Sequence, residues 1–466
     1  MRRIPALLAC VAFSSWMAPL ASAETSAYPQ ANQQALELAK EAIALRSVTG
    51  PGDKTADVAT LFKSALVAGG FSTKDIAITP VADTLYMTAT WPGSDPSLKP
   101  LVLLGHMDVV EAKPADWQRD PFTPVVENGY LFGRGATDMK LDDTLVIAAL
   151  LELKREGYHP KRTIILAFSG DEETAMRSGA ALADKLAGAE MVLNVDGADG
   201  VINEQTGKPA YFVWAAAEKT YADYKLMVTN PGGHSSEPRA DNAIDRLAKA
   251  LLRIQAYQFK PELNDITRSY FQETAKLEPG KIGAAMKAFA ANPADKKAIA
   301  TLSADPSEVG NIGTTCVVTM VSGGHATNAL PQRATANINC RIFPGHSKDA
   351  ILDELKKVAA DQSVTIEDVT AGSVATPPSP FRKDFAEAVT KAIHKIYPGL
   401  PVIPSIQAGA SDSMWFRKNG VPSYNASPVF IKPSESFMHG LNERTPVSSI
   451  PPATEYLMSI IPDLSH

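Results

Sequence analysis

The stretch LVLLGHMDVV, residues 101–110, is the most informative segment of this chain. Its apolar run Leu101–Gly105 predicts a buried β-strand, and His106 and Asp108 follow directly. The pair would serve a metal site if His106 bound the ion and Asp108 accepted the other ring N–H, which fixes the tautomer. The alternative is a His–Asp pair that only caps a loop.

Two further apolar runs have the same form. Thr163–Phe168 precedes Glu172 and Glu173 in FSGDEE, and Met191–Val195 precedes Asp196 in LNVDG. In an open α/β sheet, ligands bind beyond the carboxyl ends of the strands. Three segments that are far apart in the sequence therefore deliver polar side chains to one rim of a sheet.

Each polar residue also has a simpler reading. Asp138 follows two glycines in GRGATDMK and opens a long helix, so it could bridge two metals or act as an N-cap. Glu172 and Glu173 repel each other unless a cation or a shared proton lies between them, but they could form a solvated acidic loop. Asp196 could be a turn residue, and His439 in FMHGLNE a loop histidine.

The combination is stronger than its parts. Two imidazoles and five carboxylates form the nitrogen and oxygen ligand set that suits zinc. With metal bound, one of the adjacent glutamates can be a ligand and the other a general base. The set is His106, Asp108, Asp138, Glu172, Glu173, Asp196 and His439.

Strand and helix patterns alternate along the first half of the chain, which predicts a doubly wound α/β fold with a parallel sheet. The helical patterns cover Gln33–Ser47, Ala56–Gly69, Asp142–Gly157, Ser178–Leu186, Asn242–Ala256 and Phe385–Ile396. The pattern changes after Trp214, and the Pro-rich VATPPSP marks a linker. We therefore expect a catalytic domain, residues 24–217 and 372–466, interrupted by an inserted domain, residues 218–371.

Composition and the first residues limit the cellular context. The net charge of −6, with mixed signs, argues against nucleic acid or an anionic membrane as partner. Residues 1–23 resemble a cleaved signal peptide that ends in Ala-Ser-Ala, which predicts export to the periplasm or secretion. A lipoprotein site at Cys10 is the alternative. No later segment has 18 uninterrupted apolar residues, so we expect no membrane span.

The remaining cysteines and histidines carry weaker signals. Cys316 and Cys340 lie in the neighbouring strands of a predicted hairpin and could form a disulfide in an exported protein, but the strand register, and hence the pairing, stays open. We expect three histidines on the surface, while two near the hairpin could be either exposed or buried. The surface set is His159, His394 and His466, and the open pair is His325 and His346.

These motifs resemble the co-catalytic zinc hydrolase family of acetylornithine deacetylase, succinyl-diaminopimelate desuccinylase, aminoacylase and glutamate carboxypeptidase. The resemblance runs from LVLLGHMDVV to HGLNERTPVS. GHSSEP, TTCVVTMVSGG, NALPQRATANINCRIFPG and AGASDS resemble the subgroup of Gly-X carboxypeptidase and the secreted N-fatty-acyl-amino-acid hydrolase/synthase. The resemblance implies a zinc-exopeptidase-type catalytic domain, an inserted α+β satellite domain that forms a homodimer, and two Zn²⁺ ions per chain, which Co²⁺ or Mn²⁺ could replace.

The resemblance also implies roles for the metal ligands. His106 and Asp196 would hold one zinc, Glu173 and His439 would hold the other, and Asp138 would bridge the two.

The catalytic and substrate roles follow from the same resemblance. Asp108 would orient His106, and Glu172 would be the base. His234 and Asn328, in the inserted domain, would reach the active site of the other subunit, and Arg341 would receive a substrate carboxylate.

The implied reaction is hydrolysis of the amide bond next to a free carboxylate. A carboxypeptidase or dipeptidase and an N-acyl-amino-acid amidohydrolase or synthase both fit. A zinc-binding protein without turnover is a third reading, against which the intact Glu172 argues. Leu141 stands where the family commonly has glycine, which predicts a packing change without loss of metal, and we expect Lys260–Ser303 to shape the acyl pocket.

Overall fold

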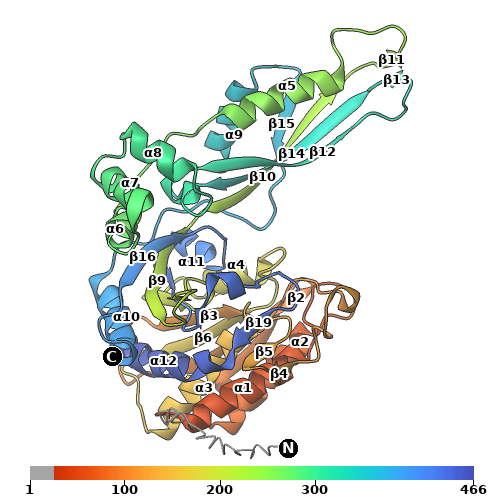
Figure 1. Ribbon diagram of the computed structural model, residues 1–466. Helices are drawn as coiled ribbons and strands as arrows, with labels where there is room; N and C mark the ends of the chain where they lie inside the picture. Colours follow the sequence, from red (N-terminus) through yellow and green to blue (C-terminus); the bar gives the residue numbers. More distant parts are fainter. Residues whose placement is uncertain (1–25) are drawn as a thin grey trace, which may run out of the picture.

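The apolar run at Leu101 is a central strand of a ten-stranded sheet (Figure 1). The computed structural model describes residues 26–466, so the expected signal peptide lies outside the described residues. The order is β1-β2-β6-β3-β7-β17-β9-β8-β18, with β16 paired to β9. The strands are β1 (Ile76–Val81), β2 (Thr84–Trp91), β3 (Leu101–His106), β6 (Ile164–Ser169), β7 (Met191–Asn194), β8 (Gly200–Ile202), β9 (Pro209–Glu218), β16 (Val402–Gln407), β17 (Ser423–Asn425) and β18 (Phe430–Ile431).

The centre of this sheet is parallel and its flanks are mixed. Strands β6, β3, β7 and β17 run parallel. The β1–β2 and β8–β9 pairs are antiparallel because each is joined by a short connection, whereas a parallel pair needs a long crossover. The pairs β2–β6 and β17–β9 are also antiparallel, so the parallel part of the sheet is limited to its centre and to the β16–β9 and β18–β8 pairs.

Helices cover both faces of the sheet, as the alternation of strands and helices predicts. Along β3, Leu101 and Leu103 point to one hydrophobic cluster and Val102 and Leu104 to another, because side chains alternate between the faces of a strand. The first cluster contains α1 (Pro29–Ile43), α2 (Thr55–Ala68), α3 (Lys140–Arg155), α10 (Lys383–Ile396) and α12 (Ile450–Ser465). The second contains α4 (Arg177–Lys185) and α11 (Ser413–Lys418).

A second, antiparallel sheet has the order β12-β14-β10-β15, and α5 and α9 pack on it around a separate core (Figure 1). Its elements are β10 (Thr220–Thr229), β12 (Thr315–Gly323), β14 (Arg333–Ile342), β15 (Val364–Asp368), α5 (Ala243–Ala256) and α9 (Lys348–Ala359). A two-stranded ribbon, β11 (Gly233–His234) with β13 (Ala329–Leu330), lies at the end of this unit farthest from the central sheet. The predicted fold class, an α/β catalytic domain with an inserted α+β satellite domain, is confirmed.

Three helices that follow α5 and precede β12 in the sequence form a further small core. They are α6 (Asp265–Thr274), α7 (Gly280–Ala291) and α8 (Lys296–Ser303). The shorter elements are β4 (Val125–Glu127), β5 (Tyr130–Phe132), β19 (Arg444–Pro446), η1 (Thr73–Asp75), η2 (Pro114–Asp116), η3 (Val309–Ile312), η4 (Pro433–Glu435) and η5 (Val447–Ser449). No helix within residues 26–466 is both long and apolar enough to cross a membrane.

Two adjacent residues anchor the junction between the sheets. Glu218 ends β9 and forms a buried ion pair with Arg417 of the catalytic domain. Lys219 follows and donates hydrogen bonds to the carbonyl oxygens of Gly310 and Gly313, at 3.0 and 2.8 Å, on the satellite side. Because consecutive side chains bind opposite domains, the junction is fixed on both sides.

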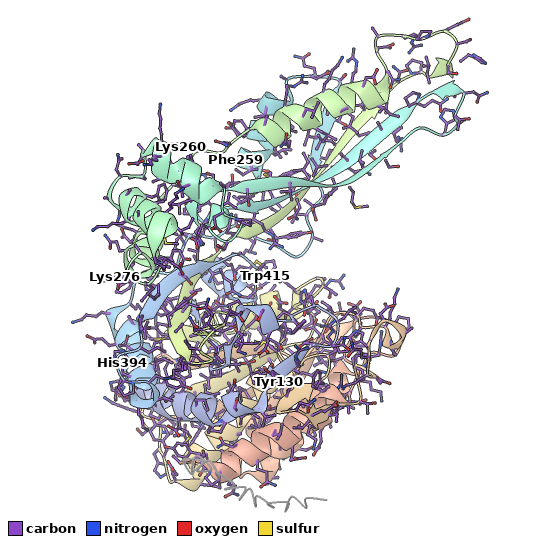
Figure 2. The ribbon with its side chains drawn as sticks, viewed as in Figure 1. Tyr130, Phe259, Lys260, Lys276, His394 and Trp415 are labelled. Atoms are coloured by element: carbon purple, nitrogen blue, oxygen red, sulfur yellow. A yellow bond between two sulfur atoms is a disulfide. The ribbon has the colours of Figure 1, made fainter. Side chains whose placement is uncertain are left out.

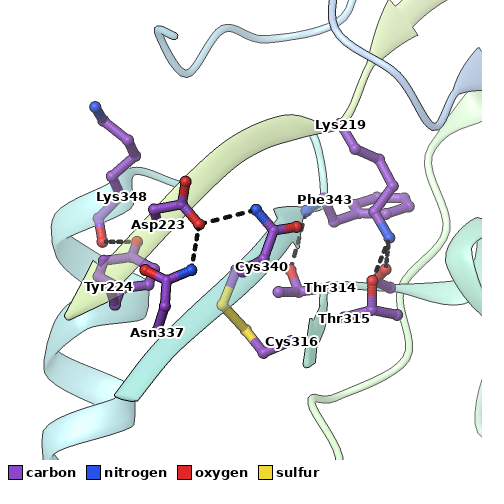
Figure 3. The surroundings of a disulfide bond; sticks show 12 residues. Lys219, Asp223, Tyr224, Thr314, Thr315, Cys316, Asn337, Cys340, Phe343 and Lys348 are labelled. Carbon is purple, nitrogen blue, oxygen red and sulfur yellow. Dashed lines mark hydrogen bonds between the residues drawn. A yellow bond between two sulfur atoms is a disulfide. The ribbon is translucent and has the colours of Figure 1, made fainter. Parts of the chain in front are cut away.

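The disulfide that the sequence left open is present. Cys316 on β12 lies directly opposite Cys340 on β14, and the two sulfur atoms are bonded (Figure 3). The strand register decides this pairing, and one residue of slip would have separated the two side chains.

Candidate active site

Three neighbouring strands deliver their polar residues to one edge of the sheet. His106 is the last residue of β3 and is almost fully buried. Glu172 and Glu173 follow β6, and Asp196 follows β7, after strand ends within one residue of those expected. The parallel pairing of β3 with both β6 and β7 brings these ends together, as predicted.

The potential ligands form three overlapping groups, and the ligand atoms within each group lie within 4.8 Å of one another. The first is His106, Asp138 and Asp196, the second is Asp138, Glu173 and His439, and the third is His106, Glu172 and Glu173. Asp138 is common to the first two groups. This sharing is the geometry that a carboxylate between two metal ions requires.

Asp138 does not act as the N-cap of the following helix. Helix α3 begins at Lys140, and its N-cap residue, Met139, makes no side-chain cap bond. Instead Oδ1 of Asp138 lies 3.0 Å from Nε2 of His106, and Oδ2 lies 3.2 Å from Nε2 of His439. The helix thus starts two residues earlier than expected, and the Asp138 side chain points into the ligand cluster.

Asp108 supports the cluster in two ways. Nδ1 of His106 lies 3.0 Å from the backbone oxygen of Asp108 and 3.5 Å from its carboxylate. The carboxylate itself accepts the backbone N–H groups of Glu172 and Glu173, at 3.0 and 3.1 Å. Asp108 therefore fixes the glutamate loop with its side chain, and its backbone oxygen is the nearer partner of the imidazole.

The acidic loop is buried and not solvated. Glu172 is 7% exposed, and burial raises its pKa well above the ordinary value. Asp171 has a structural role, since its carboxylate accepts the backbone N–H groups of Arg177 and Ser178 at the start of α4. Glu172 and Glu173 therefore do not form the solvated acidic loop that was the alternative, and both face the ligand cluster.

The charges of the cluster fit metal ions. Burial raises the pKa of Glu173, and burial also raises that of Asp196 well above its usual range. Hydrogen bonds to Asp138 and Glu173 raise the pKa of His439 to about 10. Burial opposes ionisation of Asp138, but its hydrogen bonds to His106 and His439 hold its pKa below the usual range. Without metal, protons on the histidines balance the carboxylates, and divalent cations would replace those protons.

Two buried asparagines hold Asp196, and the sequence reasoning missed both. Oδ1 of Asn194 accepts the backbone N–H of Asp196 at 3.1 Å, and Nδ2 of Asn425 donates to its backbone oxygen at 2.7 Å. Asn194 is 1% exposed within the apolar run MVLNV. A buried amide in a central strand needs hydrogen-bond partners, and this was the available signal.

A cleft of about 520 Å³ joins the cluster to the satellite domain. Glu172, Glu173 and His439 line one side, and Tyr221, Asp223 and Arg341 line the other. Val369, Ala371, Gly372 and Ser373, at the end of the satellite domain and directly after it, also line the cleft. The structure thus places Arg341 in the cleft of its own chain.

The surroundings of Arg341 leave its charge available. Its Nη1 donates to the backbone oxygen of Ala408 at 3.3 Å, and its guanidinium lies 4.9 Å from the centre of the Tyr221 ring. Asp223 also lines the cleft, but its carboxylate already accepts hydrogen bonds from Asn337, at 2.8 Å (Figure 3), and from Asn339, at 3.1 Å. A guanidinium in this setting suits an incoming carboxylate.

His234 and Asn328 lie elsewhere. The backbone N–H of Ser235 donates to the backbone oxygen of Asn328 at 3.0 Å, so both residues sit at the β11–β13 ribbon. Both are exposed, and neither lines the cleft of its own chain. The ribbon is the part of the satellite domain farthest from the central sheet (Figure 1).

The stretch Lys260–Ser303 does not have the position we expected. None of its residues lines the cleft, and α6 packs along β16 instead. The apolar residues of α6–α8 are used in their own core, which pattern alone could not distinguish from a pocket wall. Leu141 is the second residue of α3, and its side chain is buried in the main hydrophobic core.

The surface histidines are placed as predicted. His159, His394 and His466 are exposed, and Figure 2 shows His394 on the outer surface of α10. Of the two histidines left open, His325 is exposed. His346 is half-buried, and its Nε2 lies 2.8 Å from Oε2 of Glu262.

Residues 102–463 match the profile of Peptidase family M20/M25/M40. The chain belongs to this family. It is therefore a metallopeptidase or amidohydrolase, as the sequence motifs indicated.

Members of the family with different activities resemble it to a similar extent. The N-fatty-acyl-amino acid synthase/hydrolase PM20D1 of Mus musculus is 27% identical over 380 residues, covering 79% of this chain and 75% of that protein. A probable carboxypeptidase S-like 2 of Dictyostelium discoideum is 28% identical over 388 residues, covering 80% and 73%. The M20 metallo-carboxypeptidase Sso-CP2 of Sulfolobus solfataricus has the same fold, with a TM-score of 0.70 at 20% identity over 92% of this chain and 98% of that one.

Proposed function

We propose that this M20 protein is an exported di-zinc hydrolase that cleaves the amide bond next to a free carboxylate in a peptide or an N-acyl amino acid. The observation that carries the proposal is Asp138, whose two oxygens face two different histidines, His106 and His439. One ion would take His106 and Asp196, the other Glu173 and His439, with Asp138 common to both. Two Zn²⁺ ions would activate a water and polarise the amide carbonyl.

The protein groups divide the remaining work. Glu172, 4.0 Å from Nε2 of His106, would take the proton of the attacking water and return it to the leaving amine. Arg341 would bind the substrate carboxylate through both oxygens and so orient the scissile bond in the cleft. His234 of the partner subunit would donate to the developing oxyanion, with Asn328 of the partner subunit beside it.

The proposed trans contribution requires a dimer, and β12 supports one. This strand is the edge of the satellite sheet, and one of its sides lacks a partner strand among the described residues. It exposes Val317 (58%), Met320 (70%) and Val321 (70%). Natural edge strands are usually protected with charge or covered, so a long apolar edge favours pairing with a second copy of the chain. We propose that residues 218–371 form the dimerising satellite domain.

The tests of export and of catalysis are separate. If the signal peptide is removed after Ala23, mass spectrometry of the exported protein should find Glu24 first, and a lipid-modified Cys10 would contradict this.

For catalysis, the metal-stripped protein is reloaded with zinc, cobalt or manganese and assayed against matched dipeptides, acetyl-amino acids and long-acyl amino acids. Preference for dipeptides would identify a peptidase, and preference for acyl-amino acids an amidohydrolase, the reading that the mouse relative favours. A protein that binds two metal ions but hydrolyses none of these substrates would instead be the zinc-binding protein without turnover.

A further inference from the structure

Glu443 lies next to the ligand cluster and is not a ligand. It is fully buried and follows His439 by four residues. Its Oε1 accepts three backbone N–H groups, those of Gly135 at 3.1 Å, Thr137 at 2.7 Å and Asp138 at 3.0 Å. One carboxylate oxygen thus gathers the loop that presents the central ligand of the cluster.

The other oxygen of Glu443 binds Arg134, which is also buried. Nη2 of Arg134 donates to the backbone oxygen of Gly440, next to His439, at 3.2 Å. The guanidinium lies 5.1 Å from the centre of the Trp117 ring. The pair is therefore compensated in charge and touches both loops, the one with Asp138 and the one with His439.

Neither loop has helix or strand geometry to set its position. His439 has a positive φ of 60°, and Asp138 lies in a turn before α3. Loops of this kind are held by specific hydrogen bonds, and here those bonds converge on the Glu443–Arg134 pair. The backbone N–H of Gly133 also donates to the backbone oxygen of Glu443 at 3.0 Å.

We propose that Glu443 is the positioning residue that sets the spacing between Asp138 and His439, and so the affinity and geometry of the metal pair. This inference rests on the proposed function. The proposed role requires a carboxylate, because both side-chain oxygens of Glu443 accept hydrogen bonds from N–H donors. Glutamine would turn its NH₂ group either toward the three backbone N–H groups or toward Arg134, and either orientation opposes donor to donor.

The test compares the full-length protein with Glu443→Gln and with Glu435→Gln as the matched control. Glu435 lies in the same segment, and within residues 26–466 its carboxylate accepts a hydrogen bond from Tyr130, at 2.9 Å, and none from either ligand loop. Zinc and cobalt affinities are measured by chelator competition, the visible spectrum of the cobalt-loaded protein reports ligand geometry, and circular dichroism reports folding.

We expect Glu443→Gln to bind metal about 10- to 100-fold more weakly and to shift the cobalt spectrum. Glu435→Gln should match the wild type in both. A folded Glu443→Gln with wild-type affinity and spectrum would overturn the inference while leaving the proposed function intact. A wild type that binds neither ion would overturn the proposed function and the inference together.

If Glu443→Gln does not fold, Arg134→Lys decides the question. Lysine keeps the buried positive charge for Glu443 but cannot reach both Glu443 and Gly440 with a planar fork. Weaker metal binding by folded Arg134→Lys would support the inference, and unchanged binding would overturn it.

Discussion

Oε1 of Glu173 lies 3.0 Å from Nε2 of His439, although the two residues are 266 positions apart in the chain. One follows a strand of the first half of the catalytic domain, and the other lies in a loop after the satellite domain. A site that joins them can form only after the two halves of the catalytic domain have come together. This dependence makes the site testable by substitutions that separate metal binding, proton transfer and substrate binding.

Replacing Glu172 with glutamine should separate catalysis from metal binding. We expect about two metal ions per chain to remain, while turnover falls on the order of 10²–10⁴-fold because the general base is lost. Elemental analysis together with steady-state kinetics measures both. Asp138→Ala is the contrast, since it should lose metal as well as activity. Near-wild-type turnover by metal-loaded Glu172→Gln would remove the base assignment.

Metal binding should release protons, and affinity should rise with pH. The hydrogen bonds to Asp138 and Glu173 raise the pKa of His439 to about 10, so near neutral pH its imidazole is protonated in the metal-free protein. Only the neutral ring can bind metal, so lowering the pH favours the competing proton and weakens binding. Titration calorimetry in two buffers of different ionisation enthalpy measures the released protons. Heats that do not depend on the buffer would contradict the prediction.

Amidation of the substrate carboxylate should reveal the role of Arg341. In the wild type, amidation should lower kcat/KM strongly, since a lost buried charge partner costs roughly 2–5 kcal/mol. Arg341→Ala should already lack this interaction and should respond much less. Arg333, exposed on the same strand, provides the control substitution to alanine. Equal sensitivity in Arg341→Ala and the wild type would mean that another residue binds the carboxylate.

Mixed dimers should show whether His234 acts in trans. His234→Ala and Glu172→Ala homodimers should each be almost inactive. In a mixed dimer, one site combines the intact glutamate of the His234→Ala chain with the intact histidine of the other chain, so activity should return to about half per dimer. Subunit exchange followed by an activity assay measures this. No recovery in proven mixed dimers, or a strictly monomeric protein, would exclude the trans arrangement.

The local chemistry of this protein could be predicted from its sequence. The apolar runs before His106, Glu172 and Asp196 predicted the strand ends to within one residue, because a strand covered on both faces is mostly apolar. Adjacent glutamates after a core strand indicated a cation, since burial of like charges needs one. The predicted strand ends and the doubly wound fold class follow from such local rules.

Only the tertiary structure decided which distant groups meet. It showed that Asp138 is not a helix cap but lies beside two histidines. It also placed Arg341 in the cleft and His234 on the distant β11–β13 ribbon. It also paired Cys316 with Cys340 through strand register and packed α6 against β16. The reason is physical: periodicity records which face of an element is buried, whereas the partner of that face depends on chain paths and packing that no local pattern encodes.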